Sequence, residues 1–365
     1  QGSYAKIPPQ TCHGPLSQDA ARILPLLPGP GSPLSAEESS RKTLGGNTVL
    51  DIGQTYEYEE MRLCRTAEHT RAYIKIQDGC NQFCSYCAIP YARGRVRSRR
   101  MEDVLEEVRG LAVQGVREIN LVAQDTSRYG LDLYGKYKLP ELIREVCKID
   151  GVRWVRILYC YPERITDELI QTMAEEPKVV KYIDLPVQHG SGKVLREMNR
   201  QGDRESILQV LRRIRAGIPG VVIRTTMIAG FPGETEADFA ELQALVREAK
   251  FERLGCFAYS QEEDTPAGER EDQLPEELRR RRADLIMEQQ APIAFAWAQG
   301  CVGRELEVLV EGREDGRYCG RSYMDAPDID TKVYFTAKKS CRPGEFCRVR
   351  VTGAEGYDLL GEEAL

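Results

Sequence analysis

The sequence lacks any apolar run approaching the roughly 20 residues that a membrane-spanning helix needs. Its first residues, QGSYAKIPPQTCHG, contain neither the basic, apolar and cleavage regions of a signal peptide nor an initiator methionine. We therefore expect a soluble protein with no membrane partner. The missing methionine leads us to expect that Gln1 marks a fragment boundary.

A large excess of charge of either sign is also missing, because the 365 residues carry a formal net charge of −6. The chain as a whole is therefore not expected to be attracted to nucleic acid or to an anionic membrane. Twelve cysteines without a secretion signal indicate a reducing compartment, in which thiols bind metals or do chemistry. We expect a cytoplasmic protein.

The middle of the chain alternates short β-branched runs with amphipathic segments, which predicts an α/β fold. Thr166, Asp203 and Thr235 stand where helix N-caps are expected. Strands that alternate with helices form parallel sheets, so we expect a partial (β/α)6 barrel with its site at the carboxyl ends of the strands. The six predicted strands cover residues 72–76, 118–123, 154–159, 179–185, 221–229 and 254–260.

The two ends of the chain differ from this core. Residues 1–70 have little periodic pattern and contain a proline-rich stretch, LPLLPGPGSPLSAEESS. A charged helix at 275–299 leads to short alternating strands with glycines between them, which predicts a small antiparallel β-barrel. The predicted domains are a remnant and linker at 1–70, a core at 71–299 and a barrel at 300–365.

Three cysteines, Cys80, Cys84 and Cys87, follow the first predicted strand in the segment DGCNQFCSYCAIP. A structural zinc site needs four ligands, and only three are clustered here, with His69 and His189 far away in the sequence. Inert buried thiols are a second alternative. Three thiolates on a four-iron cluster would instead leave one iron free to react. The spacing favours this iron–sulfur interpretation.

The Cys-x3-Cys-x2-Cys pattern after the first strand of a six-unit βα core resembles the radical S-adenosylmethionine (SAM) enzymes. The resemblance implies that Cys80, Cys84 and Cys87 bind a [4Fe-4S] cluster whose open iron holds SAM, the source of a hydrogen-abstracting 5′-deoxyadenosyl radical. It also implies that Tyr86 packs against the adenine, although an ordinary packed tyrosine is the alternative. Polar motifs close other strands, in LVAQDTSRYG, LPVQHGS and MIAGFPGET. From these we expect a cofactor pocket built from Gln124, Asp125, Gln188 with its neighbour His189, Gly230 and Glu234.

The wider sequence, including YIKIQDGCNQFCSYCAIPYARGRVRSR and FAYSQEEDTPA, looks like the methylthiotransferases, which replace C–H by C–S–CH3. The segments GRSYMDAPDIDTKVYF and YDLLGE are similar to the C-terminal domain of the RimO family, whose substrate is an aspartate of a small-subunit ribosomal protein. Residues 301–365 carry 10 basic and 13 acidic side chains, a net of −3, which suits a basic protein better than RNA. The C-terminal barrel is accordingly expected to be TRAM-like.

The resemblance thus implies methylthiolation of the aspartate β-carbon, with a one-electron reductant and a sulfur donor as further partners. The alternatives are a tRNA adenosine methylthiotransferase of the MiaB type and a non-catalytic remnant that binds ribosomal protein or RNA. The family carries a second [4Fe-4S] cluster on three upstream cysteines, of which Cys12 is the candidate third ligand. Cys64 is not expected to be a ligand. The second cluster requires further cysteines upstream of Gln1.

Two arginine runs and the remaining cysteines have simple structural explanations. The arginines of YARGRVRSRR either contact SAM or substrate or form a solvated run, and those at 279–282 are expected on a solvated helix face. The remaining thiols are expected to be buried and inert: Cys147, Cys160, Cys256, Cys301, Cys319, Cys341 and Cys347.

Overall fold

The computed structural model describes Tyr58 and residues 70–364, all of which lie in one compact unit. The expectations for the N-terminal domain, Cys12, Cys64 and His69 lie outside the described residues.

Six parallel strands form the core, in two three-stranded sheets with the orders β1-β4-β5 and β6-β7-β8. A bridge between Val155 and Val179 links the two sheets. The α/β prediction is confirmed, and each predicted strand is present. Their bounds are β1 (Arg71–Lys75), β4 (Glu118–Val122), β5 (Trp154–Ile157), β6 (Tyr182–Asp184), β7 (Val222–Ala229) and β8 (Arg253–Ala258).

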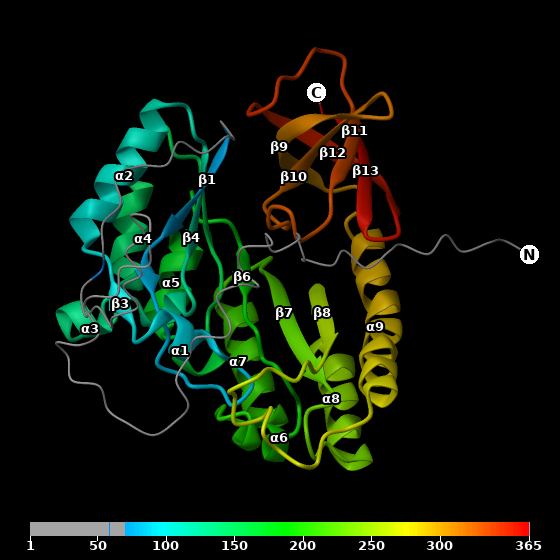
Figure 1. Cartoon of the computed structure of the whole chain (residues 1–365). Helices are drawn as coiled ribbons and strands as arrows, with labels where there is room; N and C mark the ends of the chain where they lie inside the picture. Colours follow the sequence, from blue (N-terminus) through cyan, green and yellow to red (C-terminus); the bar gives the residue numbers. More distant parts are fainter. Residues whose placement is uncertain (1–57, 59–69, 365) are drawn as a thin grey trace, which may run out of the picture. The chain divides into compact units, whose positions relative to one another are not determined.

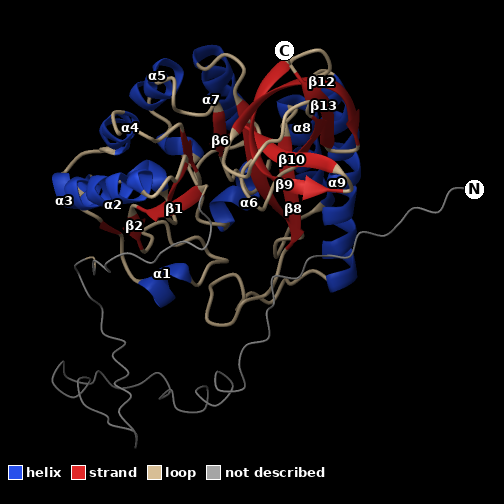
Figure 2. Cartoon of the chain, turned by 90° about the horizontal axis from the view of Figure 1, so that it is seen from above, coloured by secondary structure: helices blue, strands red, loops and turns tan. Residues whose placement is uncertain are grey.

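Helices cover the outer side of these strands (Figures 1 and 2). The outward strand residues Ile74, Ile119 and Ile223 are fully buried in one apolar cluster with residues of these helices. Side chains alternate along a strand, so the intervening residues face the interior of the partial barrel. The helices are α2 (Met101–Val113), α4 (Leu139–Cys147), α5 (Asp167–Glu175), α7 (Arg204–Gly217) and α8 (Glu236–Ala249), and the side chains of Thr166, Asp203 and Thr235 cap the last three.

Several short elements were not predicted, because each is too brief to show a period of its own. They lie mostly in the loops that follow strands, where they shape the site. They are β2 (Gln77–Asp78), α1 (Ile89–Arg93), β3 (Arg97–Ser98), α3 (Leu131–Tyr134), α6 (Gly192–Glu197) and the 3-10 turns at Thr126–Arg128 and Pro162–Arg164.

After helix α9 (Glu276–Gln299) the chain forms a closed five-stranded barrel with the order β10-β11-β13-β12-β9. The small barrel is as predicted, except that β11 pairs with β13 in parallel. Its strands are β9 (Glu305–Glu314), β10 (Arg317–Ser322), β11 (Val333–Thr336), β12 (Phe346–Glu355) and β13 (Asp358–Glu363).

The C-terminal barrel contacts the amino ends of the core strands. Glu118, the first residue of β4, accepts from Arg156 Nε at 3.0 Å and from Arg321 Nη2 at 2.6 Å. Arg253, which begins β8, donates to Asp325 at 2.6 Å, and Tyr182, which begins β6, donates to Asp330 at 2.6 Å. The barrel therefore occupies one end of the core strands and leaves their carboxyl ends for the site. No helix within the described part of the chain is long and apolar enough to cross a bilayer.

Candidate active site

The three clustered cysteines lie in the loop that follows β2, at the carboxyl end of the first core strand. Cys80 and Cys84 are each 6% exposed, and Cys87 is partly exposed. Cys80 N donates to Gly94 O at 3.1 Å, and Cys87 N donates to Cys84 O at 3.0 Å. The backbone therefore holds the three thiols on one compact turn.

The thiols suit a cluster better than a single ion. No three His, Cys, Asp or Glu side chains among the described residues converge on one metal position. In a [4Fe-4S] cluster each thiolate binds a different iron, so the sulfurs need only surround a larger group. Gln82 N donates to Cys80 Sγ at 3.4 Å, which favours the thiolate, whereas burial raises the pKa of Cys80 and of Cys87. Among the described residues the structural-zinc alternative has no fourth ligand, because the side chain of His189 is bonded to Glu234 and Ser191.

The segment after α6 clamps the cysteine loop. Ser85 N donates to Met198 O at 3.1 Å, and Ser85 Oγ donates to Glu197 O at 2.7 Å. The side chain of Asn199 donates to the carbonyls of Gln82 and Phe83, both at 2.9 Å. These contacts fix the loop before any cofactor binds.

At the end of β4 the predicted pair Gln124 and Asp125 have different environments. Asp125 accepts from Ser127 Oγ at 2.5 Å and from Arg164 at 2.8 Å, and burial raises the pKa of its carboxyl. Arg164 also donates to Gln82 at 2.6 Å, which ties the strand end to the cysteine loop. Gln124 Oε1 is buried without a hydrogen-bond partner among the described residues. Gln124 is therefore the open acceptor of the pair.

Arg200, which the sequence reasoning missed, brings a buried cation to the cysteine loop. Its guanidinium lies 4.1 Å from the ring centre of Tyr161, and it donates to Pro186 O at 3.1 Å. Its Nε and Nη1 have no hydrogen-bond partner among the described residues. The nearby Glu163 Oε1 is buried and accepts no hydrogen bond from these residues either. Burial raises the pKa of the neighbouring Tyr86, with Cys84 adding to the effect and Arg200 opposing it. No motif in the sequence marks Arg200.

At the ends of β6 and β7 the predicted residues form a closed network. Glu234 Oε2 accepts from Gly230 N at 2.8 Å and from His189 Nε2 at 3.1 Å, and Glu234 Oε1 accepts from Arg282 at 2.8 Å. Because His189 Nδ1 accepts from Ser191 N, Nε2 carries the ring hydrogen. Glu234 thus shapes the glycine turn and has no free oxygen. Gln188 has a left-handed backbone, with φ 70°, and forms a parallel β-bridge with Met227 of β7.

The prediction of a solvated face for the arginines at 279–282 is wrong for two of them. Arg282 is 3% exposed and bound to Glu234, and Arg279 donates to Tyr259 O at 2.8 Å. They close the pocket around β7 and β8, which a local charge pattern does not reveal. In the other basic run, Arg97 pairs with Asp78 and Arg99 with Glu107. These two arginines are tied to the core, whereas Arg93, Arg95 and Arg100 are exposed.

The scattered thiols are mostly inert, as predicted. Burial raises the pKa of Cys147, Cys160, Cys256 and Cys347 to about 12. Cys301 and Cys319 are buried as well, whereas Cys256 and Cys341 are partly exposed.

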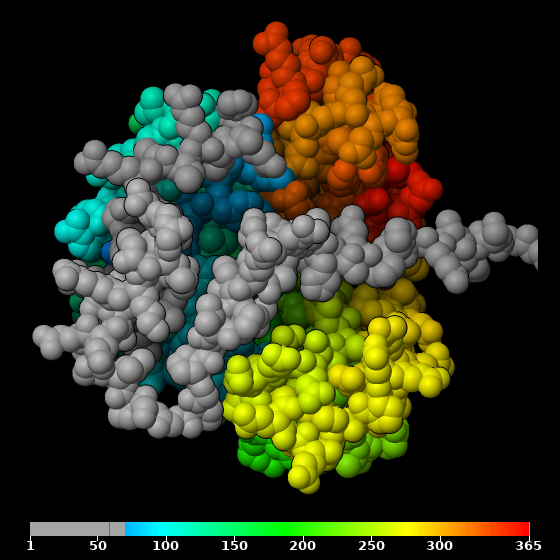
Figure 3. Space-filling view, in the orientation of Figure 1, coloured from blue at the N-terminus to red at the C-terminus, as the bar shows by residue number. Residues whose placement is uncertain are grey.

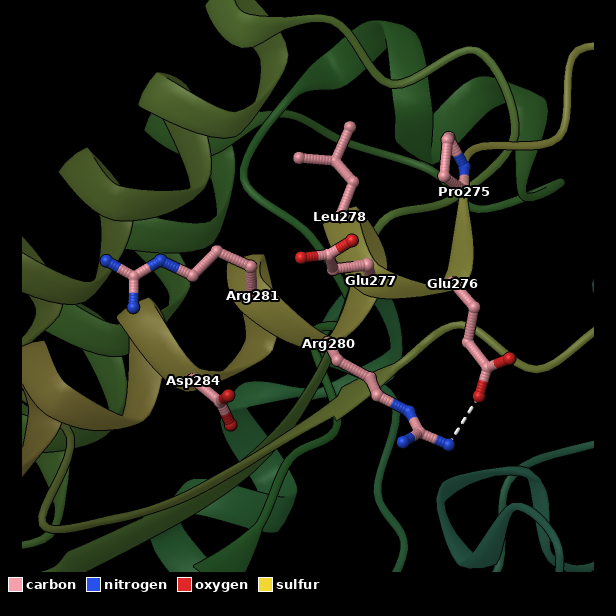
Figure 4. Close-up of a pocket in the computed structure, with 7 residues that line it drawn as sticks. All are labelled: Pro275, Glu276, Glu277, Leu278, Arg280, Arg281 and Asp284. Carbon is pink, nitrogen blue, oxygen red and sulfur yellow. Dashed lines mark ion pairs between the residues drawn. The ribbon is translucent and has the colours of Figure 1, made fainter.

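A surface hollow on the first turns of α9 is separate from the candidate site at the carboxyl ends of the strands. Figure 4 shows Glu276, Glu277, Arg280 and Asp284 along it, with Arg280 paired to Glu276. It offers no thiol, buried orphan or nucleophile among its lining residues.

Comparison with known proteins agrees with this geometry. Residues 74–246 match the Radical SAM superfamily, and residues 302–363 match the TRAM domain. The chain is 49% identical over 305 residues to ribosomal protein uS12 methylthiotransferase RimO of Desulfitobacterium hafniense, covering 83% of this chain and 68% of that protein. RimO of Thermoanaerobacter sp. is 46% identical, covering 87% and 73%. RimO of Desulforamulus reducens is 46% identical over 343 residues, covering 92% and 77%.

Among solved structures, coproporphyrinogen III oxidase HemN of Escherichia coli, a radical SAM enzyme, has a similar fold over 62% of this chain and 54% of the HemN chain. The TM-score is 0.47 and the identity 19%. The sequence relatives share most of the described core and the C-terminal barrel. The chain therefore belongs to the RimO family of radical SAM methylthiotransferases, enzymes that use a [4Fe-4S] cluster and SAM.

Proposed function

We propose that this chain methylthiolates the β-carbon of an aspartate in ribosomal protein uS12. The observation that carries the proposal is the loop of three cysteines at the carboxyl end of β1, in a chain 46–49% identical to RimO enzymes over more than 80% of its length. The domain division at 71–299 and 300–365 belongs to the same proposal, supported by the Radical SAM and TRAM matches.

Cys80, Cys84 and Cys87 would hold the cluster, each through one thiolate. When bound, the cluster supplies one electron to SAM, whose cleavage provides the group that removes a hydrogen atom from the substrate. The protein's own contribution is to fix the loop, through Asn199 and Ser85, and to keep two of the three thiols out of water. Water exclusion protects a reactive intermediate from side reactions.

The buried orphan groups beside the loop fit the amino-acid end of SAM. To a carboxylate Arg200 offers N–H donors that have no hydrogen-bond partner among the described residues, and Gln124 Oε1 offers an acceptor to an ammonium group. Tyr86 would cover the adenine from its place beside Cys84. We assign Asp125, Gln188, Gly230 and Glu234 to shaping this pocket, since the carboxylates of Asp125 and Glu234 are already bonded to protein.

The surface charge supports a basic protein as partner. Residues 261–277 contain eight acidic side chains and one arginine, a net of −7, so the rest of the chain carries +1. All eight acidic residues are exposed, and the backbone of this segment bonds to the cysteine loop through Ala267 N and Ser85 O at 2.8 Å. Figure 3 shows the segment in yellow on the surface. A ribosomal protein, which binds RNA phosphates through Lys and Arg, complements such a surface.

This location differs from the acidic C-terminal barrel on which the sequence argument relied. Several acidic side chains of the C-terminal barrel form ion pairs with basic residues of the core or of the barrel itself. Glu311 and Asp328 bind Arg71, and Asp325 binds Arg253. Residues 261–277 therefore add a concentrated, exposed acidic surface beside the cysteine loop.

The remaining parts of the proposal concern partners outside the described residues. Cys12 would be one ligand of a second cluster, and a one-electron reductant and a sulfur donor would complete the cycle. A cytoplasmic location follows from the substrate, which is assembled into ribosomes.

Anaerobic reconstitution with iron and sulfide tests the proposal. We expect 5′-deoxyadenosine from SAM and dithionite, and no product from a variant with Cys80, Cys84 and Cys87 all changed to Ala. Incubation with uS12 and, separately, with tRNA distinguishes the substrates. A fully reconstituted cluster that yields no 5′-deoxyadenosine would contradict the enzyme assignment. Hydrogen abstraction from tRNA but not from uS12 would favour the tRNA adenosine alternative.

A further inference from the structure

Tyr159 has a backbone conformation that a tyrosine rarely adopts. It follows β5 at the carboxyl edge of the sheet, and its φ is 62°, in the left-handed region. Three hydrogen bonds hold it there. Tyr159 N donates to Asp184 Oδ2 at 3.1 Å, and Tyr159 O accepts from Thr126 N at 3.0 Å and Thr126 Oγ1 at 3.1 Å. Such strain at a non-glycine residue points to a role for its side chain.

The ring of Tyr159 is open to solvent, whereas its neighbours in the chain are closed. Tyr159 is 41% exposed, and Leu158 and Cys160 are 2% and 0% exposed. Burial and the charge of the Asp184 carboxylate raise the pKa of Tyr159 against the opposing effect of Arg224. The phenol therefore stays protonated and is a hydrogen-bond donor inside the mouth of the partial barrel.

Arg224 brings a cation to the same place. It faces inward from β7, and its Nη1 donates to Asp184 Oδ1 at 2.9 Å. Its Nε lies 3.7 Å from Asp330 Oδ1, which is too far for a hydrogen bond. Its Nη2 donates to none of the described residues and is accessible to solvent. The inward arginines Arg156 and Arg253 are instead closed off under the C-terminal barrel. Arg224 Nη2 is thus a donor left for a ligand inside the partial barrel, in addition to the Arg200 donors beside the cysteine loop.

One carboxylate organises both groups. Asp184 is 1% exposed, and its two oxygens bond to the backbone of Tyr159 and to the side chain of Arg224. Tyr159 and Arg224 are therefore held around one carboxylate in the interior of the partial barrel, with Arg224 near the start of β7, in register with Arg253.

We propose that Tyr159 and Arg224 form the subsite that binds the side-chain carboxylate of the target residue, and that Asp184 is its positioning residue. The inference rests on the proposed function. Hydrogen removal from an aspartate β-carbon requires the adjacent carboxylate to be held still, and a carboxylate taken from water needs donors for its oxygens. An aspartate offers acceptors to both donors, whereas an asparagine offers one acceptor and an NH2 that faces a donor. The subsite therefore selects aspartate over asparagine.

Binding of a fluorescently labelled uS12 loop peptide to the reconstituted full chain with SAM tests the subsite. We expect Tyr159→Phe to weaken Kd about 10- to 100-fold, the range for a hydrogen bond to a charged group. Replacing the target aspartate by asparagine in the peptide should weaken wild-type binding similarly. The two changes together should cost less than the product of their separate effects, because they remove one shared contact. The matched control is Tyr357→Phe, a tyrosine 38% exposed at the tip of the β12–β13 hairpin, which should leave Kd unchanged.

Two further measurements separate a binding role from a structural one. Tyr159→Asn is expected to keep the iron content and the unfolding midpoint of the wild type, because asparagine tolerates the left-handed conformation. With a peptide deuterated at the aspartate β-carbon, Tyr159→Phe should lower kcat/KM for deuterium transfer to 5′-deoxyadenosine by the same factor as the loss in affinity.

The outcomes are distinguishable. If wild type binds the peptide and Tyr159→Phe binds it equally well, the subsite is refuted and the proposed function stands. A Tyr159→Asn variant that fails to fold, together with unchanged peptide affinity in Tyr159→Phe, would assign Tyr159 a structural role and also refute the subsite. If wild type neither binds the peptide nor takes deuterium from it, the proposed function itself fails.

Discussion

Replacing Glu118 by Gln is expected to destabilise the protein strongly, because this carboxylate joins the core to the C-terminal barrel. Its side chain is 0% exposed, as is that of Arg156, and the side chain of Arg321 is 2% exposed. Arg156 and Arg321 donate to it at 3.0 and 2.6 Å. Burial alone would raise the pKa of Glu118, but the two arginines outweigh it and hold the pKa below its usual range.

The substitution leaves the buried Arg156 guanidinium without a countercharge and leaves Arg321 with Glu311 as its remaining carboxylate partner. Breaking a buried ion pair from one side costs about 3–5 kcal/mol, and we expect a loss in this range in the free energy of unfolding measured by urea titration. The matched control is Glu305→Gln, since Glu305 also binds two arginines, Arg348 and Arg350, but on the surface. That change should leave the unfolding curve where it is.

A loss below about 1 kcal/mol for Glu118→Gln would show that water or rearrangement satisfies the two arginines, and the account of the interface would be wrong. The same result would follow if the C-terminal barrel did not contact the strand starts. A second transition in the Glu118→Gln curve would instead show that the barrel unfolds separately once the joint is broken, in agreement with the structure.

Three other predictions address the pocket, the acidic segment and pH. Arg200→Met should weaken SAM binding about 10- to 100-fold in equilibrium dialysis with the iron content unchanged, and equal affinity would remove Arg200 from the pocket. Neutralising residues 262–264 should slow association with uS12 and flatten its salt dependence in stopped-flow experiments, whereas neutralising Glu102 and Glu106 on α2 should not. Burial acts to raise the pKa of Asp238, but hydrogen bonds from Thr235 and Ser191 and contact with Lys193 hold it well below its usual range. A depressed pKa stabilises the fold above the unfolded-state pKa of about 4 and ceases to do so as the pH falls through the folded value. Asp238→Asn should therefore cost stability at pH 7 and progressively less below pH 4, and an equal cost at both pH values would contradict this reasoning.

The fold could be predicted from the sequence because each βα unit carries its own signal. Thr166, Asp203 and Thr235 announce helix starts that the structure confirms, and the β-branched runs coincide with the core strands. The β11–β13 parallel pair could not be foreseen, because strand pairing across a closed barrel depends on closure rather than on local pattern.

The site was predictable only where its residues form a motif. Cys80, Cys84 and Cys87 are neighbours in sequence, so their spacing reveals them. Arg200 and Tyr159, which we propose for the site, come near it through tertiary contacts, and neither has a local signature. Glu234 lies after β7 as expected, but the sequence could not show that Arg282 and His189 already bond to its carboxylate.

The central claim, aspartate methylthiolation by this chain, is tested most directly by mass spectrometry of uS12 from cells that lack its gene. The account predicts that uS12 from the deletion strain is lighter than wild type by one SCH3 group in exchange for hydrogen, with the difference located at a single aspartate. Re-expression of the gene should restore the mass, and re-expression with Cys80, Cys84 and Cys87 changed to Ala should not. An unchanged uS12 mass in the deletion strain would contradict the account.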